Sequence, residues 1–83
     1  MPAYVYIFCS EKIPKFYVGH TENLDIRLGQ HNSGRNIATK AGIPWTLEYT
    51  EIFPTKAEAA IRKTEIKKKK SRKYIEQLIC SVD

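Results

Sequence analysis

The most constraining feature of the sequence is an apolar run close to its start. Residues 3–9 read Ala-Tyr-Val-Tyr-Ile-Phe-Cys, without a charged side chain. β-Branched and aromatic residues suit a pleated surface, and a run without polar alternation is typical of a strand covered on both faces. The run is too short to span a bilayer. We therefore expect this segment to be the central strand of a sheet.

A second strand follows after a turn. Residues 10–15 carry charges and a proline, which indicate a turn, and Phe16-Tyr17-Val18-Gly19 resumes β character. The two segments are expected to form a hairpin.

The third predicted strand covers residues 45–53. Trp45, Leu47 and Tyr49 alternate there with polar residues, so these three are expected on one face of a half-buried strand. The preceding residues 35–44 are small, polar or basic and are expected to form a loop.

Three helices are predicted from caps and periodicity. Thr21 is the expected N-cap of the first, which ends at Asn32-Ser33-Gly34. Thr55 and Glu58 form a capping box for the second, and Ser71 is a candidate cap for the third. The residues expected to point inward are Ala57, Ala60 and Ile61 in the second helix and Ile75, Leu78 and Ile79 in the third.

The predicted order is strand, strand, helix, strand, helix, helix. This order predicts a small α+β domain with an antiparallel sheet, and 83 residues leave room for a single domain over residues 1–83. Cys9 and Cys80 lack metal-type neighbours and are expected to be reduced, structural thiols. Without a signal-peptide pattern, the expected localisation is cytoplasmic, with neither a membrane nor an obligate protein partner.

Basic residues outnumber acidic ones. Fourteen Lys and Arg against nine Asp and Glu give a formal charge of +5, and the excess lies between Arg62 and Lys73. This asymmetry favours a polyanion such as DNA or RNA as the partner. The alternative is a solvated helix face without a binding role.

Four polar side chains are expected to converge beside the hairpin. Tyr6 and Tyr17 lie on its two strands, and Arg27 and His31 are four residues apart on one side of the first helix. A guanidinium holds a phosphate oxygen and stabilises its growing charge, while Tyr or His moves protons, so the set suits phosphodiester hydrolysis. Taken singly, each of the four is equally typical of packing or surface pairing.

The ordered set of these residues resembles the GIY-YIG nuclease family, in particular its short stand-alone bacterial members. Val5-Tyr6-Ile7 stands in place of the first tripeptide, with Val5 where glycine is usual, and Tyr17-Val18-Gly19 in place of the second. Arg27-Leu28 and His31-Asn32-Ser33-Gly34 are similar to the first helix of those members. The resemblance extends over nearly the whole chain.

The resemblance implies a Mg²⁺-dependent endonuclease, a hydrolase, on a three-stranded antiparallel sheet flanked by helices. Tyr6 and Tyr17 would line the site, Arg27 would hold the phosphate, and His31 would lie beside it. One tyrosine would act as general base or orient the attacking water. The residues expected to contact nucleic acid are Gly19, Lys40, Lys63, Lys67, Lys68, Lys69, Lys70 and Arg72.

One position departs from the family pattern. The family's metal-binding glutamate falls at position 63, where this chain has Lys63. Glu65 is the nearest substitute ligand, although two helical residues turn a side chain by about 200°. An ammonium at position 63 repels Mg²⁺ and attracts phosphate. Three hypotheses therefore stay open: a metal-dependent endonuclease, a nucleic-acid-binding module without catalysis, and a structural or protein-interaction role.

Overall fold

The computed structural model of the chain describes residues 1–81 and contains one three-stranded antiparallel sheet. Its strands are β1 (Ala3–Ser10), β2 (Phe16–Thr21) and β3 (Trp45–Phe53), in the order β2-β1-β3. The prediction that residues 3–9 form the central strand is confirmed, because β1 pairs with both other strands. The predicted bounds of the third strand are also confirmed.

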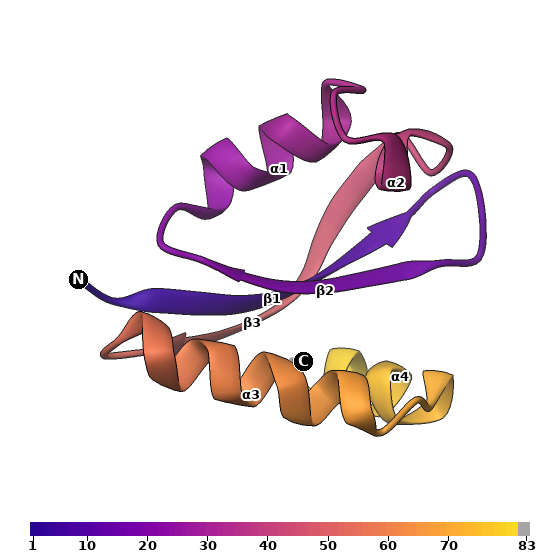
Figure 1. Cartoon of the computed structure of the whole chain (residues 1–83). Coiled ribbons are helices and arrows are strands. Elements are labelled where there is room, and N and C mark those ends of the chain that lie inside the picture. The colour runs from indigo at the N-terminus through magenta and orange to yellow at the C-terminus, as the bar shows by residue number, and fades with distance from the viewer. Residues whose placement is uncertain (82–83) are drawn as a thin grey trace.

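Helices cover both faces of this sheet (Figure 1). Helix α1 (Leu24–Asn32) and the short α2 (Ile37–Lys40) lie on one face, and α3 (Lys56–Lys68) and α4 (Arg72–Cys80) lie on the other. The α+β class and the order of the predicted elements are confirmed. The expectation of a continuous loop over residues 35–44 was wrong because Asn36 caps α2, its side chain accepting a hydrogen bond from the amide of Ala38.

The central strand supplies both hydrophobic cores. Val5 and Ile7 pack with residues of α3 and α4, whereas Tyr6 and Phe8 pack with residues of α1 and the start of β3. All four side chains are fully buried. Alternation along one strand therefore separates the two layers, and Tyr6 belongs to the α1 layer.

The expectation that Trp45, Leu47 and Tyr49 share one face of β3 was wrong, because the strand contains a bulge. Ile7 pairs with Tyr49, but the next residue, Phe8, pairs with Leu47, which leaves Glu48 as an extra residue. As a result Trp45 packs in the α1 layer and Tyr49 in the α3 layer. Leu47 is 39% exposed.

Two details of the helices also differ from expectation. The N-cap of α1 is Asn23 rather than Thr21, since the Asn23 side chain accepts from the amide of Ile26. Thr55 caps α3 and Ser71 caps α4, as predicted, and Ile75, Leu78 and Ile79 pack against the core. The prediction that Ala57, Ala60 and Ile61 point inward was wrong: the buried residues of α3 are Ala59 and Ile66.

Within residues 1–81, no helix is long and apolar enough to cross a membrane. Cys9 and Cys80 are free thiols; Cys9 is half-buried, whereas Cys80 is exposed, so the expectation of a structural thiol was wrong for Cys80.

Candidate functional site

A hydrogen bond between Tyr6 and Arg27 joins β1 to α1 at the centre of the site. The Arg27 Nε donates to the Tyr6 hydroxyl over 3.1 Å, and the Tyr6 side chain is fully buried. Burial raises the pKa of Tyr6, and the hydrogen bond and charge of Arg27 offset only part of that rise. Tyr6 is therefore a neutral phenol that orients the guanidinium.

Gly19 makes this arrangement possible. It is the cross-strand partner of Tyr6, and a Cβ at position 19 would overlap the phenol of Tyr6. The Tyr6 ring crosses β2 at the one place where the neighbouring strand has no side chain. Gly19, which was expected to contact nucleic acid, thus allows the close approach of Tyr6.

Tyr17 and His31 form the next layer of the site. Their ring centroids are 4.5 Å apart, and the Tyr17 ring lies 6.4 Å from that of Tyr6. His31 is 1% exposed, and burial, followed by the charge of Arg27, lowers its pKa. His31 is consequently a neutral imidazole near pH 7. The structure therefore brings together the four residues that were expected to converge.

Thr39 is the hydrogen-bond partner of His31. His31 Nδ1 lies 3.0 Å from the Thr39 hydroxyl, which is 3.4 Å from the carbonyl of Asn36. In the tautomer protonated on Nδ1, the hydroxyl accepts from Nδ1–H and Nε2 carries the lone pair. Nε2 is buried without a hydrogen-bond partner. A buried imidazole with a free lone pair can accept a proton or bind a polar ligand group.

Thr39 was not anticipated as a site residue because it falls in the segment expected to be a loop. Its carbonyl accepts a hydrogen bond from the Trp45 indole, and the Asn32 side chain bonds to both the amide and the carbonyl of Trp45. These contacts fasten α2 and the end of α1 to the start of β3. Asn32 follows His31 directly, but its residue type alone does not signal this role.

Two surface cavities flank Arg27. One, of about 220 Å³, is lined by Arg27, His31 and Arg35 together with Gln30 and Asn36. The other, of about 320 Å³, lies at the start of α1, where His20 and Lys56 join Arg27 in its lining. The guanidinium is thus accessible from two sides and is surrounded mainly by basic and amide groups.

His20 marks a concentration of positive charge that was not predicted. Burial lowers the pKa of His20, and the charges of Lys63, Lys56, Arg27 and Lys67 lower it further. Its Nδ1 is buried without a hydrogen-bond partner. Because these charges belong to α1 and α3, cations of both helices lie near His20 at the β2 edge of the sheet. The only sequence signal was its place directly after Gly19.

Three cations of α3 and one that follows it form a stripe beside β2. We use the term lysine stripe for Lys56, Lys63 and Lys67, whose spacing of seven and four residues keeps them on one side of α3, together with Lys70, which follows the C-cap and lines the same groove as Lys67. Lys67 Nζ lies 5.8 Å from the centroid of the Tyr17 ring, and Lys70 lines a groove with the same tyrosine. At roughly 1.5 Å per residue the helical part of the stripe, from Lys56 to Lys67, is about 16 Å long.

The other predicted nucleic-acid contacts lie outside the lysine stripe. Lys68 lines a cavity on the far side of α3, and Lys69 lies over the Tyr74 ring at 5.4 Å. Arg72 covers the Phe16 ring at 4.7 Å and donates to the carbonyl of Pro14. Lys40 is exposed at the end of α2.

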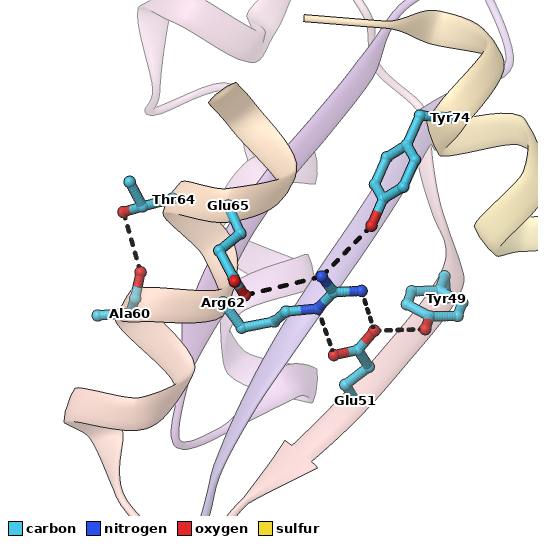
Figure 2. Close-up of polar contacts among 7 residues, drawn as sticks. All are labelled: Tyr49, Glu51, Ala60, Arg62, Thr64, Glu65 and Tyr74. Atoms are coloured by element: carbon cyan, nitrogen blue, oxygen red, sulfur yellow. Dashed lines mark hydrogen bonds and ion pairs between the residues drawn. The ribbon is translucent and has the colours of Figure 1, made fainter. Parts of the chain in front are cut away.

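A polar cluster around Arg62 fixes the rotation of α3 (Figure 2). Arg62 donates from Nε and Nη2 to the two carboxylate oxygens of Glu51 on β3, at 2.9 and 3.1 Å, and from Nη1 to the Tyr74 hydroxyl on α4. The Tyr49 hydroxyl donates to the same carboxylate. Because Arg62 is bound to β3 and α4, the next residue, Lys63, is turned toward β2.

Glu65, the expected substitute metal ligand, belongs to the Arg62 side of α3. Its carboxylate lies 3.8 Å from Arg62 Nη1, and its side chain is 60% exposed (Figure 2). Within residues 1–81 there is no group of three His, Cys, Asp or Glu that could hold a metal ion. Glu22 is the one carboxylate in the cavities beside Arg27, and Lys56 lines the same cavity. These residues do not fit a divalent metal beside Tyr6 and Tyr17.

Comparisons with known proteins agree with this geometry. Residues 2–75 match the GIY-YIG catalytic domain. A UPF0213 protein of Staphylococcus haemolyticus is 41% identical over 77% of this chain and 78% of its own, and one of Streptococcus agalactiae is 37% identical over 93% and 91%. The solution NMR structure of a UPF0213 protein from Bacillus halodurans is similar, with a TM-score of 0.58 and 36% identity over 96% of this chain and 84% of that one.

Both the sequence match and the structural match cover most of the chain, and the fold is of the nuclease type. GIY-YIG nucleases generally depend on a metal ion, which makes Lys63 a notable feature of this chain. The chain belongs to the GIY-YIG family and is related to its small UPF0213 proteins.

Proposed function

We propose that this protein binds the phosphodiester backbone of nucleic acid along the edge formed by β2, α1 and α3. The observation that carries the proposal is the lysine stripe beside β2, with Arg27 on the opposite side of the same edge. A row of cations along a groove or edge neutralises successive phosphates.

Arg27 is the contact best suited to a single phosphate. Tyr6 occupies its Nε, while Nη1 donates to the exposed side chain of Gln30, at 3.3 Å. A phosphate oxygen can replace Gln30 without leaving a buried group unpaired. The guanidinium of Arg27, oriented by Tyr6, then presents the bidentate geometry that phosphates favour.

Binding is better supported than cleavage because of Lys63. Its ammonium lies near His20, where the family pattern requires a metal-binding carboxylate. An ammonium attracts phosphate but disfavours Mg²⁺. The bound state therefore needs no rearrangement, whereas a metal-dependent reaction would need Glu65 to leave Arg62.

The second candidate function is endonucleolytic cleavage of the bound phosphodiester. It is favoured by the assembly of Tyr6, Tyr17, Arg27 and His31, and by the free Nε2 of His31. In this reaction Arg27 would stabilise the charge on the phosphorus oxygens, and His31 or a tyrosine would take a proton from water.

Salt-dependent binding tests the main proposal. A triple variant, Lys63→Gln, Lys67→Gln and Lys70→Gln, should weaken binding of a labelled oligonucleotide and reduce the slope of log K against log salt by about 2 to 3. The matched control, Lys68→Gln, Lys69→Gln and Lys73→Gln, removes equal charge from outside the stripe and should change little. Equal losses in the two triples would reject the stripe as the interface, and no binding by the wild type would reject the function.

Nicking of plasmid or branched DNA with Mg²⁺ or Mn²⁺ decides between the two candidates. Wild type and Lys63→Gln should bind without cleaving, and Lys63→Glu should gain metal-dependent nicking. Cleavage by the wild type that is lost in Arg27→Ala would instead establish the second candidate.

A further inference from the structure

A groove outside the Tyr6–Arg27 site runs between β2 and the junction of α3 with α4. Its volume is about 440 Å³; the buried Val18 and Ile66 form its floor, and the half-buried Phe16 and Ile75 form its apolar walls. Tyr17 also lines it, while the ring of the same residue packs against His31 in the α1 layer. The groove and the site already described therefore adjoin at Tyr17.

Cations surround this apolar groove. Lys15, Lys67, Lys70 and Arg72 line it, and none of its described lining residues is acidic. Arg72 is held in place over the Phe16 ring and by the carbonyl of Pro14, 2.6 Å from Nη1. A simple anion would leave the apolar walls without a contact, and an apolar ligand would leave the cations without one. A ligand with a flat apolar part and attached phosphates contacts both the walls and the cations.

The backbone at Lys70 directs one of these cations to the groove. Lys70 follows the C-cap of α3 and has a φ of 46°, the left-handed conformation that normally favours glycine. A lysine in this conformation places an ammonium at the groove where the usual glycine would place none. Lys67, one turn earlier, belongs to both the groove and the lysine stripe.

We propose that this groove binds an unpaired nucleobase of the nucleic acid whose backbone follows the lysine stripe. The inference rests on the proposed function and adds a ligand class to it. The base lies between the apolar walls, and Lys67 and Lys70 contact the phosphates on either side. A base inside a closed duplex cannot enter, so the protein selects single-stranded, frayed or branched positions.

Binding of two labelled oligomers of equal charge tests the inference. One is an eight-residue oligothymidylate, and the other is an abasic oligomer of the same length, which keeps the phosphates but has no bases. Oligothymidylate should bind at least about fivefold more tightly, the lower range for one stacked base. Phe16→Leu should reduce this ratio, with Trp45 fluorescence as the control for folding.

A second measurement does not depend on a variant. Thymidine monophosphate should shift the NMR amide signals of Phe16, Tyr17 and Ile75, whereas inorganic phosphate should not. Equal binding of both oligomers, with shifts confined to the lysine stripe, would refute base binding in the groove and leave the proposed function intact. Equally tight binding of polyglutamate would also overturn it. If neither oligomer binds, the proposed function itself fails.

Discussion

Replacement of Glu51 by glutamine tests the polar cluster that sets the rotation of α3. Glu51 accepts two hydrogen bonds from Arg62 and one from Tyr49, and the Glu51 and Arg62 side chains are 21% and 23% exposed. Glutamine has nearly the same shape but carries no charge and presents an amide NH₂ to donors. The variant therefore removes the pairing with little change in volume.

The expected loss of unfolding free energy is about 2–3 kcal/mol. A hydrogen bond to a charged group contributes roughly 1.5–3 kcal/mol, and losing one partner of a fully buried pair costs about 3–5 kcal/mol. About a fifth of each side chain is exposed, so the expected loss is smaller than for a fully buried pair. For a domain of this size the loss corresponds to a fall of roughly 10–20 °C in Tm.

Urea unfolding monitored by Trp45 fluorescence measures this loss, since Trp45 is the single tryptophan and is 4% exposed. Glu65→Gln is the matched control: it contacts the same Arg62 at 3.8 Å from a largely exposed position, and it should cost less than about 0.5 kcal/mol. Equal, small effects of Glu51→Gln and Glu65→Gln would refute the role assigned to the cluster.

The pH dependence supplies an independent check. Burial alone would raise the pKa of Glu51, but hydrogen bonds from Arg62 and Tyr49 and the charge of Arg62 outweigh it and lower that pKa below 4.5. The stabilisation is therefore fully present above pH 4.5 and is lost as the pH falls through the folded-state pKa. The difference between wild type and Glu51→Gln should stay constant from about pH 7 to 5 and shrink below that.

Three other measurements follow from the structure. Gly19→Ala should cost about 1–3 kcal/mol in urea unfolding, because its Cβ overlaps the buried Tyr6 phenol; an unchanged midpoint would contradict the close approach. Iodoacetamide at pH 8 should label the exposed Cys80 before Cys9, since burial and Glu48 raise the pKa of Cys9 to about 11, and mass spectrometry of timed samples would detect the opposite order. The NMR titration of His20 should have its midpoint below pH 6.5, and Lys63→Glu should move that midpoint upward. The same midpoint in Lys63→Glu and wild type would show that the two side chains are too far apart to interact.

The fold was predictable where burial or capping leaves a local pattern. The apolar run of β1 indicates a strand covered on both faces, and Thr55 and Ser71 mark helix starts. The bulge at Glu48 could not be predicted, because it arises from pairing with β1 and leaves the alternation of β3 unchanged in the sequence. Helix α2 has four residues, too few for a periodic signal.

The site was predictable only as far as residue order and helical spacing reach. Tyr6, Tyr17, Arg27 and His31 come together as the hairpin and the first helix require. The contact of Thr39 with His31 depends on how α2 folds back, and His20 has no periodic or compositional signal. Within the basic run, helical spacing separates Lys63 and Lys67 of the lysine stripe from Lys68 and Lys69, which composition alone does not distinguish.

The two-sided role of β1 limits how such a domain can change over evolutionary time. A single-residue insertion in β1 would exchange the two sets of side chains, presenting Tyr6 to the α3 layer and Ile7 to the α1 layer, so that both cores would fail together. Position 63 lies at the rim and takes part in neither core. Single substitutions at the rim can therefore change the charge of the site, whereas the fold does not tolerate a change of register in its central strand.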